Sequence, residues 1–321
     1  MSTKVSSNLS QESYNLTQDI QLEAIGLGKQ YSNGDWGVKD LTLTYQGGDF
    51  VALVGANGAG KTTTLHLLSG VIRPTAGHVI LTKRSKRLKP GLIGWSSQRD
   101  SVDWSLTVYE NVLFGAKLAM MSIREAHIAT QRILNLVDLK SVAKKSPDLL
   151  SGGQLRRMQV ARALVHEPPV VLLDEPTSGL DPAGTDLLLC YLRQRAQDGA
   201  LIIVSSHDLN VLNDFCRYVV HIAKGTVLAS ATRADYIRRF GNWFYLRIEY
   251  HGSLSSSVEA EIRNLSKAIL SVSPLLIAVE EEDQANQISA LVRESAEVLS
   301  VTKGSPGLRE IYLVLEGVNA V

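Results

Sequence analysis

Three short apolar stretches stand out along the chain, and polar or glycine residues follow each of them at once. The stretches are Phe50–Val54, Val170–Leu173 and Leu201–Val204. Continuous apolar runs of this length are typical of strands buried on both faces, as in parallel sheets. A helical pattern over Lys61–Leu68 follows the first of them. The pattern predicts an α/β fold whose ligands bind at the carboxyl ends of the strands.

The rest of the first two thirds of the chain divides into a tail and a helical insert. Residues 1–20 are rich in Ser, Gln and Asn, and we expect a disordered polar tail there, because too few apolar residues are present to offset the entropy of ordering. Helical periodicity over Ile123–Leu139 and Leu155–His166 predicts a helical subdomain at about residues 100–168. Residues 21–238 are therefore expected to form one large domain.

Residues 239–321 are predicted to form a small separate α+β domain. Strand and helix patterns alternate there without the long apolar runs of the preceding region. The expected elements are a strand at Trp243–Tyr250, a helix at Val258–Leu270, a strand at Leu275–Val279, a helix at Gln284–Val298 and a short helix at Leu308–Leu315.

Composition narrows the range of functions. The 321 residues are 45% hydrophobic, and 33 basic residues against 32 acidic ones give a net charge of +1, so no bulk charge favours nucleic acid. Cys190 and Cys216 lack any metal-binding or disulfide spacing and are expected to be buried, reduced thiols. No apolar run reaches the roughly 18 residues of a membrane span, which predicts a cytoplasmic chain.

A glycine-rich stretch follows the first predicted strand and opens a helix. It matches the pattern GxxxxGK[ST], in which backbone N–H groups surround phosphate oxygens at a helix N-terminus. Lys61 is expected to reach the β- and γ-phosphates and Thr62 to bind magnesium. The residues expected to bind nucleotide here are Gly55, Ala56, Asn57, Gly58, Ala59, Gly60, Lys61, Thr62 and Thr63.

Two carboxylates end the second predicted strand. Asp174 is suited to hold magnesium through its water shell, and Glu175 to orient the water that attacks the γ-phosphate. A carboxylate pair in this position also occurs as a simple helix cap or loop pair. His207, after the third strand, is a candidate donor to the γ-phosphate, and Gln98 a candidate ligand of magnesium or water; both have ordinary structural interpretations as well.

The segment Leu150–Gln154, with sequence LSGGQ, provides a second candidate phosphate site. Its glycines expose backbone N–H groups, its serine offers a hydroxyl, and a helix begins directly after it. One phosphate chain already has a site in the first loop. A second site in the same chain is useful if it faces the nucleotide of another copy, which predicts an ATP-dependent dimer.

Together these motifs resemble, in identity and order, those of ATP-binding-cassette (ABC) ATPases over residues 21–238. The resemblance implies a P-loop NTPase cassette with a mixed sheet core and an inserted helical subdomain, which binds ATP and Mg²⁺ in a head-to-tail dimer. It also implies adenine stacking on Tyr31, for which Trp36 is a competitor, and a role for Asp181 in linking the two sites. The residues implied to contact ATP from the second copy are Ser151, Gly152, Gly153 and Gln154.

The resemblance extends to partners and location. Members with a single cassette serve an integral membrane permease subunit from the cytoplasmic face of the membrane, and the end of this chain resembles the accessory tail of exporters. Candidate contacts with the permease, for which core packing is an equal explanation, are Trp104, Leu106, Val108 and Tyr109. The alternative is a soluble family member that acts on ribosomes or nucleic acid. Such members carry two cassettes, a long coiled coil or zinc-binding inserts, and this sequence has none of these patterns.

Overall fold

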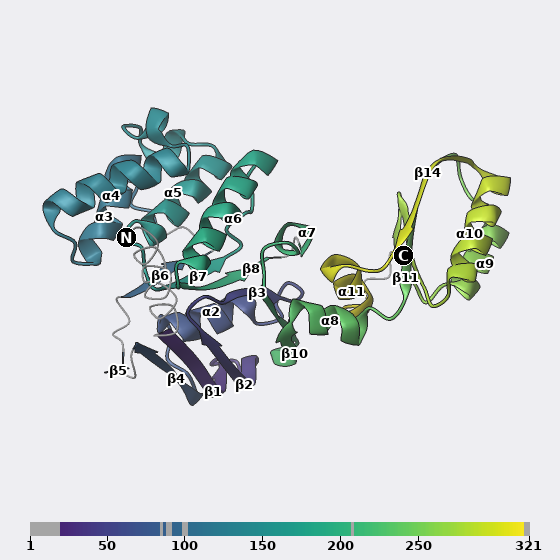
Figure 1. The fold of residues 1–321 in the computed structure, drawn as a ribbon, viewed down its shortest axis with the longest axis horizontal. Coiled ribbons are helices and arrows are strands. Elements are labelled where there is room, and N and C mark those ends of the chain that lie inside the picture. The colour runs from purple at the N-terminus through teal and green to yellow at the C-terminus, as the bar shows by residue number, and fades with distance from the viewer. Residues whose placement is uncertain (1–19, 84–85, 88–91, 98–101, 207–208, 318–321) are drawn as a thin grey trace, which may run out of the picture. The chain divides into compact units, whose positions relative to one another are not determined.

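The structure is a computed structural model that describes residues 20–83, 86–87, 92–97, 102–206 and 209–317. These residues form two compact units (Figure 1). The first contains the described residues up to Ser206 together with Phe215–Ser230, and the second contains residues 209–214 together with the described chain from Ala231 onward. The predicted tail, apart from Ile20, lies outside the described residues.

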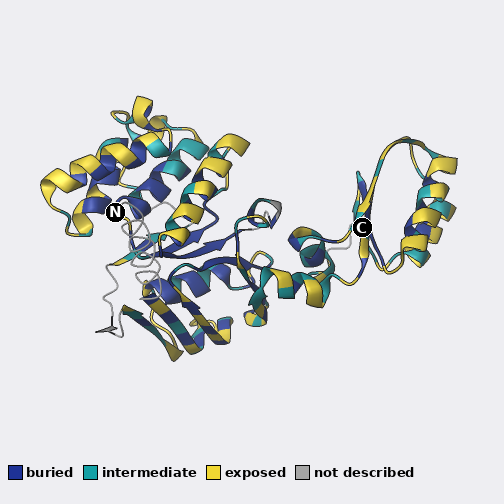
Figure 2. Cartoon of the chain, in the orientation of Figure 1, coloured by how far each residue is buried: buried dark blue, intermediate teal, exposed yellow. Residues whose placement is uncertain are grey.

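A six-stranded sheet forms the centre of the first unit. Its strand order is β10-β9-β3-β8-β7-β6, and β3 pairs in parallel with β8 and β9, as β7 does with β6 and β8. Every residue of β3, β7 and β8 is buried (Figure 2), as their apolar runs predict. The strands are β3 (Phe50–Val54), β6 (Ile93–Ser96), β7 (Val170–Asp174), β8 (Leu201–Ser205), β9 (Tyr218–Ala223) and β10 (Thr226–Thr232).

A second, antiparallel sheet covers the helix that follows β3. Its order is β2-β1-β4-β5, with alternating buried and exposed positions that give it one apolar face. Helix α2 (Lys61–Ser69) packs against both sheets, and one core joins Leu22 and Leu41, Leu65 of α2, and Leu172 and Ile203. The helix that starts at the phosphate loop is therefore fixed from two sides. The strands are β1 (Ile20–Gln30), β2 (Trp36–Gln46), β4 (Ala76–Lys83) and β5 (Lys86–Arg87).

The helical subdomain contains α3 (Val108–Leu118), α4 (Ile123–Leu136) and α5 (Gly152–Leu164). Each starts at a capping box, in which a side-chain hydroxyl accepts from the backbone three residues on and a Glu or Gln side chain accepts in return. Two 3₁₀ turns, Lys140–Val142 and Pro147–Leu149, join α4 to α5. Helix α5 begins three residues earlier than its apolar pattern predicts, because the glycines before that pattern are already helical.

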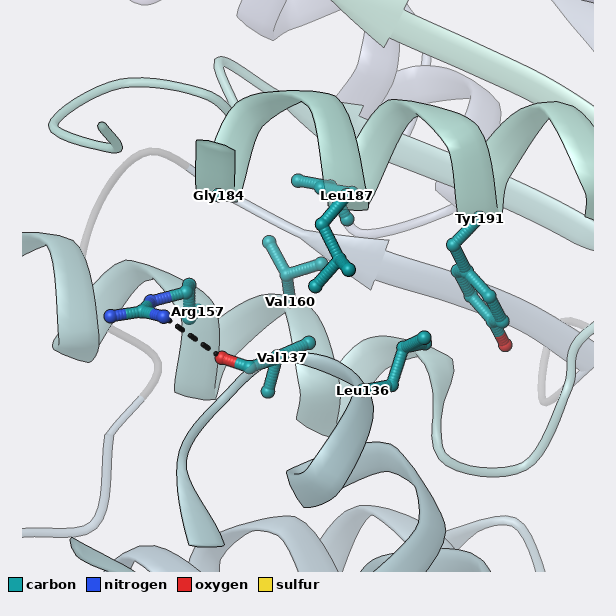
Figure 3. A pocket seen from close by; sticks show the side chains of 8 residues that line it. Leu136, Val137, Arg157, Val160, Gly184, Leu187 and Tyr191 are labelled. Carbon is teal, nitrogen blue, oxygen red and sulfur yellow. Dashed lines mark hydrogen bonds between the residues drawn. The ribbon is translucent and has the colours of Figure 1, made fainter. Parts of the chain in front are cut away.

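Helix α6 (Pro182–Gln197) packs on β8 and borders the helical subdomain. A cavity of about 10 Å³ lies between α6, α5 and the end of α4, lined chiefly by apolar side chains (Figure 3). That volume holds about one water molecule, so the subdomain and α6 are closely packed. The prediction of two buried thiols was half wrong: Cys216 is buried, but Cys190, on α6, is exposed.

The second unit is an antiparallel sheet of order β12-β13-β11-β14 with helices α9 and α10 on one face. The chain order β-α-β-β-α-β with this strand order is the split-βαβ arrangement. Helices α7, α8 and α11 complete the unit. Its elements are α7 (Leu209–Leu212), α8 (Arg233–Phe240), β11 (Phe244–His251), α9 (Ser256–Leu265), β12 (Ala268–Val272), β13 (Leu275–Val279), α10 (Glu282–Ser295), β14 (Glu297–Gly304) and α11 (Leu308–Leu315).

Two strands of this sheet were not predicted from the sequence. Residues Ala268–Leu270 and Glu297–Val298, predicted as the ends of helices, belong to β12 and β14. Strand β12 forms because it pairs with β13, the next strand in the sequence, and β14 because it pairs with β11, which is remote in sequence. The pattern within each segment does not report such pairing. Helix α8 spans the predicted boundary at residue 238, and the whole of it lies in the second unit.

Candidate functional site

The phosphate loop connects β3 to α2 in a conformation that requires glycine. Gly55 has φ 153°, and a Cβ atom there would lie 2.2 Å from the carbonyl oxygen of Ile222. Gly60 has φ 111°, and its Cβ would lie 2.3 Å from the carbonyl oxygen of Gly37. The loop is therefore pressed between β9 and the start of β2, and any side chain at these two positions would displace it.

The Lys61 ammonium lies within this loop. It is buried, and it donates to the carbonyl oxygens of Gly55 at 2.6 Å and of Ala56 at 3.1 Å. Backbone carbonyls are weaker partners for a cation than phosphate oxygens are. Lys61 is thus held where an incoming phosphate chain can replace these carbonyls.

Hydrogen bonds join the start of α2 to Asp174, the carboxylate that ends β7, and to β8. The Thr62 hydroxyl donates to Asp174 Oδ2 at 2.7 Å, and the Ser205 hydroxyl donates to Asp174 Oδ1 at 2.5 Å. The three residues come from α2, β7 and β8, and Asp174 pairs in register with Ser205. The structure therefore brings together Thr62 and Asp174, which the sequence predicts as partners, and adds Ser205. The sequence offered one indication of Ser205, which is its position directly after the predicted buried strand Leu201–Val204.

Glu175 adopts a rare backbone conformation beside Asp174. Its φ is 52°, a left-handed value that costs free energy for a residue with a side chain. Its N–H donates to the Ser205 hydroxyl at 2.9 Å and lies 3.2 Å from the Ser205 carbonyl oxygen. The Arg156 guanidinium donates to its carbonyl oxygen at 3.2 Å. Neighbouring groups thus hold the peptide on both sides of Glu175 and stabilise its unusual geometry.

Replacement of Ser205 by alanine tests this role. The change removes the donor to Asp174 and an acceptor for the Glu175 N–H inside a fully buried site. Because a hydrogen bond to a charged group contributes about 1.5–3 kcal/mol, we expect kcat for the ATP hydrolysis that the resemblance implies to fall about tenfold or more. Steady-state hydrolysis assays measure the effect. Ser289→Ala, which removes a half-buried hydroxyl on α10, is the control. Equal rates for the two variants would contradict the role of Ser205.

His66 is a described histidine that lies close enough to Asp174 for its pKa to respond to that charge. His66, on α2, packs edge-on against Trp95 with ring centroids 5.2 Å apart. Burial lowers the pKa of His66, and the negative charge of Asp174 acts in the opposite direction. Burial is the larger of the two effects, so the pKa of His66 lies below its ordinary value.

The LSGGQ segment forms the beginning of α5. The Ser151 hydroxyl caps the helix by accepting from the Gln154 N–H at 3.3 Å, and the Gln154 side chain accepts from the Ser151 N–H at 3.1 Å. A Cβ on Gly153 would lie 2.4 Å from the carbonyl oxygen of Gly179, whereas a Cβ on Gly152 would meet no atom within 4 Å. The helix start therefore packs tightly against the loop after Glu175 on one side and is open at Gly152.

Tyr31 and Trp36 lie near the beginning of α2. The Tyr31 hydroxyl is 3.0 Å from Thr63 Oγ1, and the ring lies so close to Gly37 that a Cβ there would be 2.7 Å from it. Tyr31 is 43% exposed and Trp36 is 38% exposed, and the Lys39 ammonium lies 5.8 Å from the Trp36 ring centroid. Both rings remain candidates for stacking on a base, with Tyr31 tied directly to the phosphate-loop helix.

The remaining predicted residues are Asp181, Gln98, His207 and the candidate permease contacts. Asp181 caps α6 by accepting from the Gly184 N–H at 3.1 Å. Gln98 and His207 lie outside the described residues. Of the four candidate permease contacts, Val108 is fully buried, Leu106 and Tyr109 are partly buried, and Trp104 is 50% exposed. Core packing thus explains Val108 and does not explain Trp104.

A parallel sheet that presents a glycine-rich loop, a lysine and an aspartate at its carboxyl edge defines a P-loop nucleoside-triphosphatase. The expected fold class is confirmed. Residues 38–178 match the family described as ABC transporter, and the chain belongs to this family. It is an ATP-binding and ATP-hydrolysing protein.

Particular relatives and structures agree with this assignment. The chain is 27% identical to the linearmycin resistance ATP-binding protein LnrL of Bacillus subtilis over 87% of this chain and 93% of LnrL. It is 33% identical to the Nod factor export ATP-binding protein I of Rhizobium johnstonii over 65% of this chain and 68% of that protein. The dimeric, post-hydrolysis structure of the ATP-binding cassette MJ0796 with ADP and Pi matches 66% of this chain and 98% of that one, with 27% identity and a TM-score of 0.60. The chain spans 63–65% of the length of three other curated relatives that it matches.

Proposed function

We propose that this chain is the ATP-hydrolysing subunit of an exporter, acts as a dimer on two ATP molecules, and drives a separate membrane subunit. The observation that carries the enzymatic part is the hydrogen-bonded chain from Thr62 through Asp174 to Ser205, next to a buried Lys61. It joins the phosphate loop to the carboxylates across three elements. A phosphate chain bound in the loop therefore has its charge partners already in position.

Nucleotide binding and hydrolysis use different residues. Backbone N–H groups of the loop and the N-terminus of α2 surround the phosphates, and Lys61 exchanges its carbonyl partners for phosphate oxygens. Glu175 accepts a hydrogen bond from the attacking water and orients it toward the γ-phosphate. The backbone contacts of Glu175 with Ser205 and Arg156 keep this carboxylate in place. His207 is proposed to donate to the γ-phosphate from the next strand end.

The residues beside the loop fit a magnesium ion. The Thr62 hydroxyl oxygen and Asp174 Oδ2 are 2.7 Å apart, and hydroxyl and carboxylate oxygens are the ligands that Mg²⁺ prefers. Thr62 would bind it directly, Asp174 through water, and the Gln98 amide is a third candidate. When bound, the ion neutralises charge on the β- and γ-phosphates.

The signature helix supports the proposed dimer. Gly152 is open at the start of α5, where backbone N–H groups point out of the helix. We propose that Ser151, Gly152, Gly153 and Gln154 contact the γ-phosphate of ATP held by the phosphate loop of a second copy. Asp181, which starts the helix after the Glu175 loop, then lies between the two sites. The dimeric state of the MJ0796 cassette supports this arrangement.

We propose that the direction of transport is export. Relatives named for Nod factor export match 60–65% of this chain, about the same share as the 66–68% matched by relatives named for import. The match to the linearmycin resistance protein covers 87% of this chain and reaches into the second unit. This longer match and the resemblance of the chain's end to the accessory tail of exporters support export. No helix in the described ranges is both long and apolar enough to cross a membrane. We further propose that the permease is a separate protein, contacted in part by the exposed ring of Trp104, and that this chain binds it on the cytoplasmic face of the membrane.

Co-purification tests this proposal. We expect tagged chain, extracted from its native membranes in mild detergent, to retain an integral membrane protein with several spanning helices. Trp104→Ala is expected to weaken that association, whereas Trp243→Phe, a conservative change in the second unit, is expected to preserve it. Recovery of ribosomal or nucleic-acid partners without a membrane protein would overturn the transport proposal and leave the ATPase assignment intact.

A further inference from the structure

Arg156 is a buried arginine in the second turn of α5. It is 7% exposed, and its guanidinium donates to three backbone carbonyls and one side-chain amide. The carbonyl oxygens are those of Ser97 at 2.6 Å, of Glu175 at 3.2 Å and of Asp174. The amide oxygen is Gln159 Oε1 at 2.9 Å, one turn further along the same helix.

These carbonyls belong to two motifs of the site. Asp174 and Glu175 end β7, and Ser97 follows β6 and directly precedes Gln98 in the sequence. Strands β6 and β7 are adjacent and parallel, with Ser96 paired to Leu173. A single guanidinium therefore spans the carboxyl ends of two neighbouring strands and connects both to α5.

The same helix begins with the signature residues. Gly152 and Gly153 precede Arg156 by four and three positions, so they lie on the same side of α5, one turn closer to its N-terminus. Gly153 also packs against Gly179, in the loop that follows Glu175. The loop that carries the hydrolytic carboxylate is thus fastened to the signature helix at two points.

The chemistry of these contacts indicates positioning. Burying a guanidinium is costly unless its N–H groups are satisfied. The four acceptors are neutral dipoles that fix where the backbone of residues 97, 174 and 175 lies. The planar guanidinium of an arginine can donate to several carbonyls at once, whereas the single ammonium of a lysine does so less well. A displacement of α5 must therefore displace the peptides of Asp174 and Glu175 or break these hydrogen bonds.

We infer that Arg156 is a positioning residue through which the signature helix of one copy controls the hydrolytic carboxylate of that same copy. In the proposed dimer, the signature helix contacts the ATP bound by the partner copy. ATP bound at one site then changes the position of Glu175 at the other site. Through this contact, Arg156 makes hydrolysis at the two sites cooperative. This inference rests on the proposed function and adds a route of communication between the two ATP sites.

The adjacent residue provides a matched control. Arg157 has the same side chain on the same helix, but it faces the helical subdomain: its guanidinium donates to the Val137 carbonyl oxygen at 3.1 Å and lies 3.5 Å from an Asp138 carboxylate oxygen. Figure 3 shows the Arg157 contact beside the small cavity between α5 and α6. Loss of Arg157 removes a charge and a buried stem from α5 without touching Asp174 or Glu175.

The experiment compares purified full-length wild type with Arg156→Gln, Arg156→Lys and Arg157→Gln. Nucleotide affinity, kcat, the Hill coefficient for ATP and the unfolding temperature are measured for each. For Arg156→Gln we expect ATP affinity to stay within about twofold and kcat to fall about 10- to 100-fold, since misplacing a catalytic group by about 1 Å has an effect of that size. The Hill coefficient should fall from near 2 toward 1. Arg156→Lys should recover part of both, and Arg157→Gln should resemble wild type.

Two outcomes would overturn the inference. One is an Arg156→Gln variant whose kcat and Hill coefficient match those of Arg157→Gln. The other is a folded Arg156→Gln variant that retains wild-type cooperativity while hydrolysing slowly, since Arg156 would then support the site without joining it to the second one. Failure of the proposed function is distinct: in that case wild type itself would show neither ATP-dependent dimers nor cooperative hydrolysis, and the inference would fall with it.

Discussion

Replacing Glu175 by glutamine is expected to stop hydrolysis while leaving ATP binding intact. The amide is close in size and keeps the backbone contacts with Ser205 and Arg156, but it cannot accept a proton from the attacking water. General-base catalysis contributes about 10²- to 10⁴-fold, so we expect kcat to fall by about 10³-fold. Nucleotide titration should give an affinity close to that of wild type.

The same variant provides a test of the dimer. Because ATP is bound and not consumed, Glu175→Gln should accumulate as an ATP-dependent dimer in size-exclusion chromatography. Glu294→Gln makes the same chemical change on an exposed position of α10 and should hydrolyse ATP normally. A Glu175→Gln variant with an unchanged hydrolysis rate would remove the role assigned to this carboxylate.

Replacing Lys61 by alanine is expected to weaken nucleotide binding. The ammonium is buried in the phosphate loop, so the phosphate chain would lose its nearest desolvated positive charge. Truncating one partner of a buried charge pair costs about 2–5 kcal/mol, and about 3 kcal/mol corresponds to an affinity roughly 100-fold lower. Isothermal titration calorimetry with ATP measures the loss of affinity.

Stability and affinity need to be separated in this experiment. Lys61 also holds the loop through the Gly55 and Ala56 carbonyls, so its loss could loosen the loop before any ATP is present. An unfolding temperature close to that of wild type would show that the chain remains folded. Lys117→Ala, on the exposed side of α3, serves as the charge-matched control. Wild-type affinity in the Lys61→Ala variant would rule out the phosphate-binding role.

The local motifs were readable because their chemistry depends on neighbours in the sequence. A phosphate loop needs consecutive backbone N–H groups and glycines at fixed spacing, and Gly55 and Gly60 show the left-handed or crowded backbone that such a loop requires. The apolar runs of β3, β7 and β8 can likewise be recognised from the sequence, because a strand buried on both faces has no polar side. Because both patterns are local, the sequence predicted the helix that starts at Lys61 and the parallel strands of the central sheet.

Contacts between remote segments were not readable in this way. Arg156 has no special sequence pattern, and Ser205 is marked only by its position after a predicted strand. Their roles follow from the packing of α5 on the strand ends and from the register of β7 with β8. The first residues of β12 and β14 were assigned to the ends of helices. A short apolar run such as Ala268–Leu270 satisfies either period, and the pairing of β12 with β13 and of β14 with β11 selects the strand.

By itself, the sequence determined the class of chemistry: a loop for phosphates, a lysine, and carboxylates at strand ends. Each of these depends on a short segment whose geometry is set by local backbone preferences. The tertiary structure alone decided how the carboxylates are held. Thr62 and Ser205 fix the Asp174 side chain, and Arg156 fixes the peptides of Asp174 and Glu175, through hydrogen bonds between residues 30 or more positions apart, or on separate elements. Such contacts exist only after the sheet and α5 have packed, because no local pattern encodes which distant groups will meet.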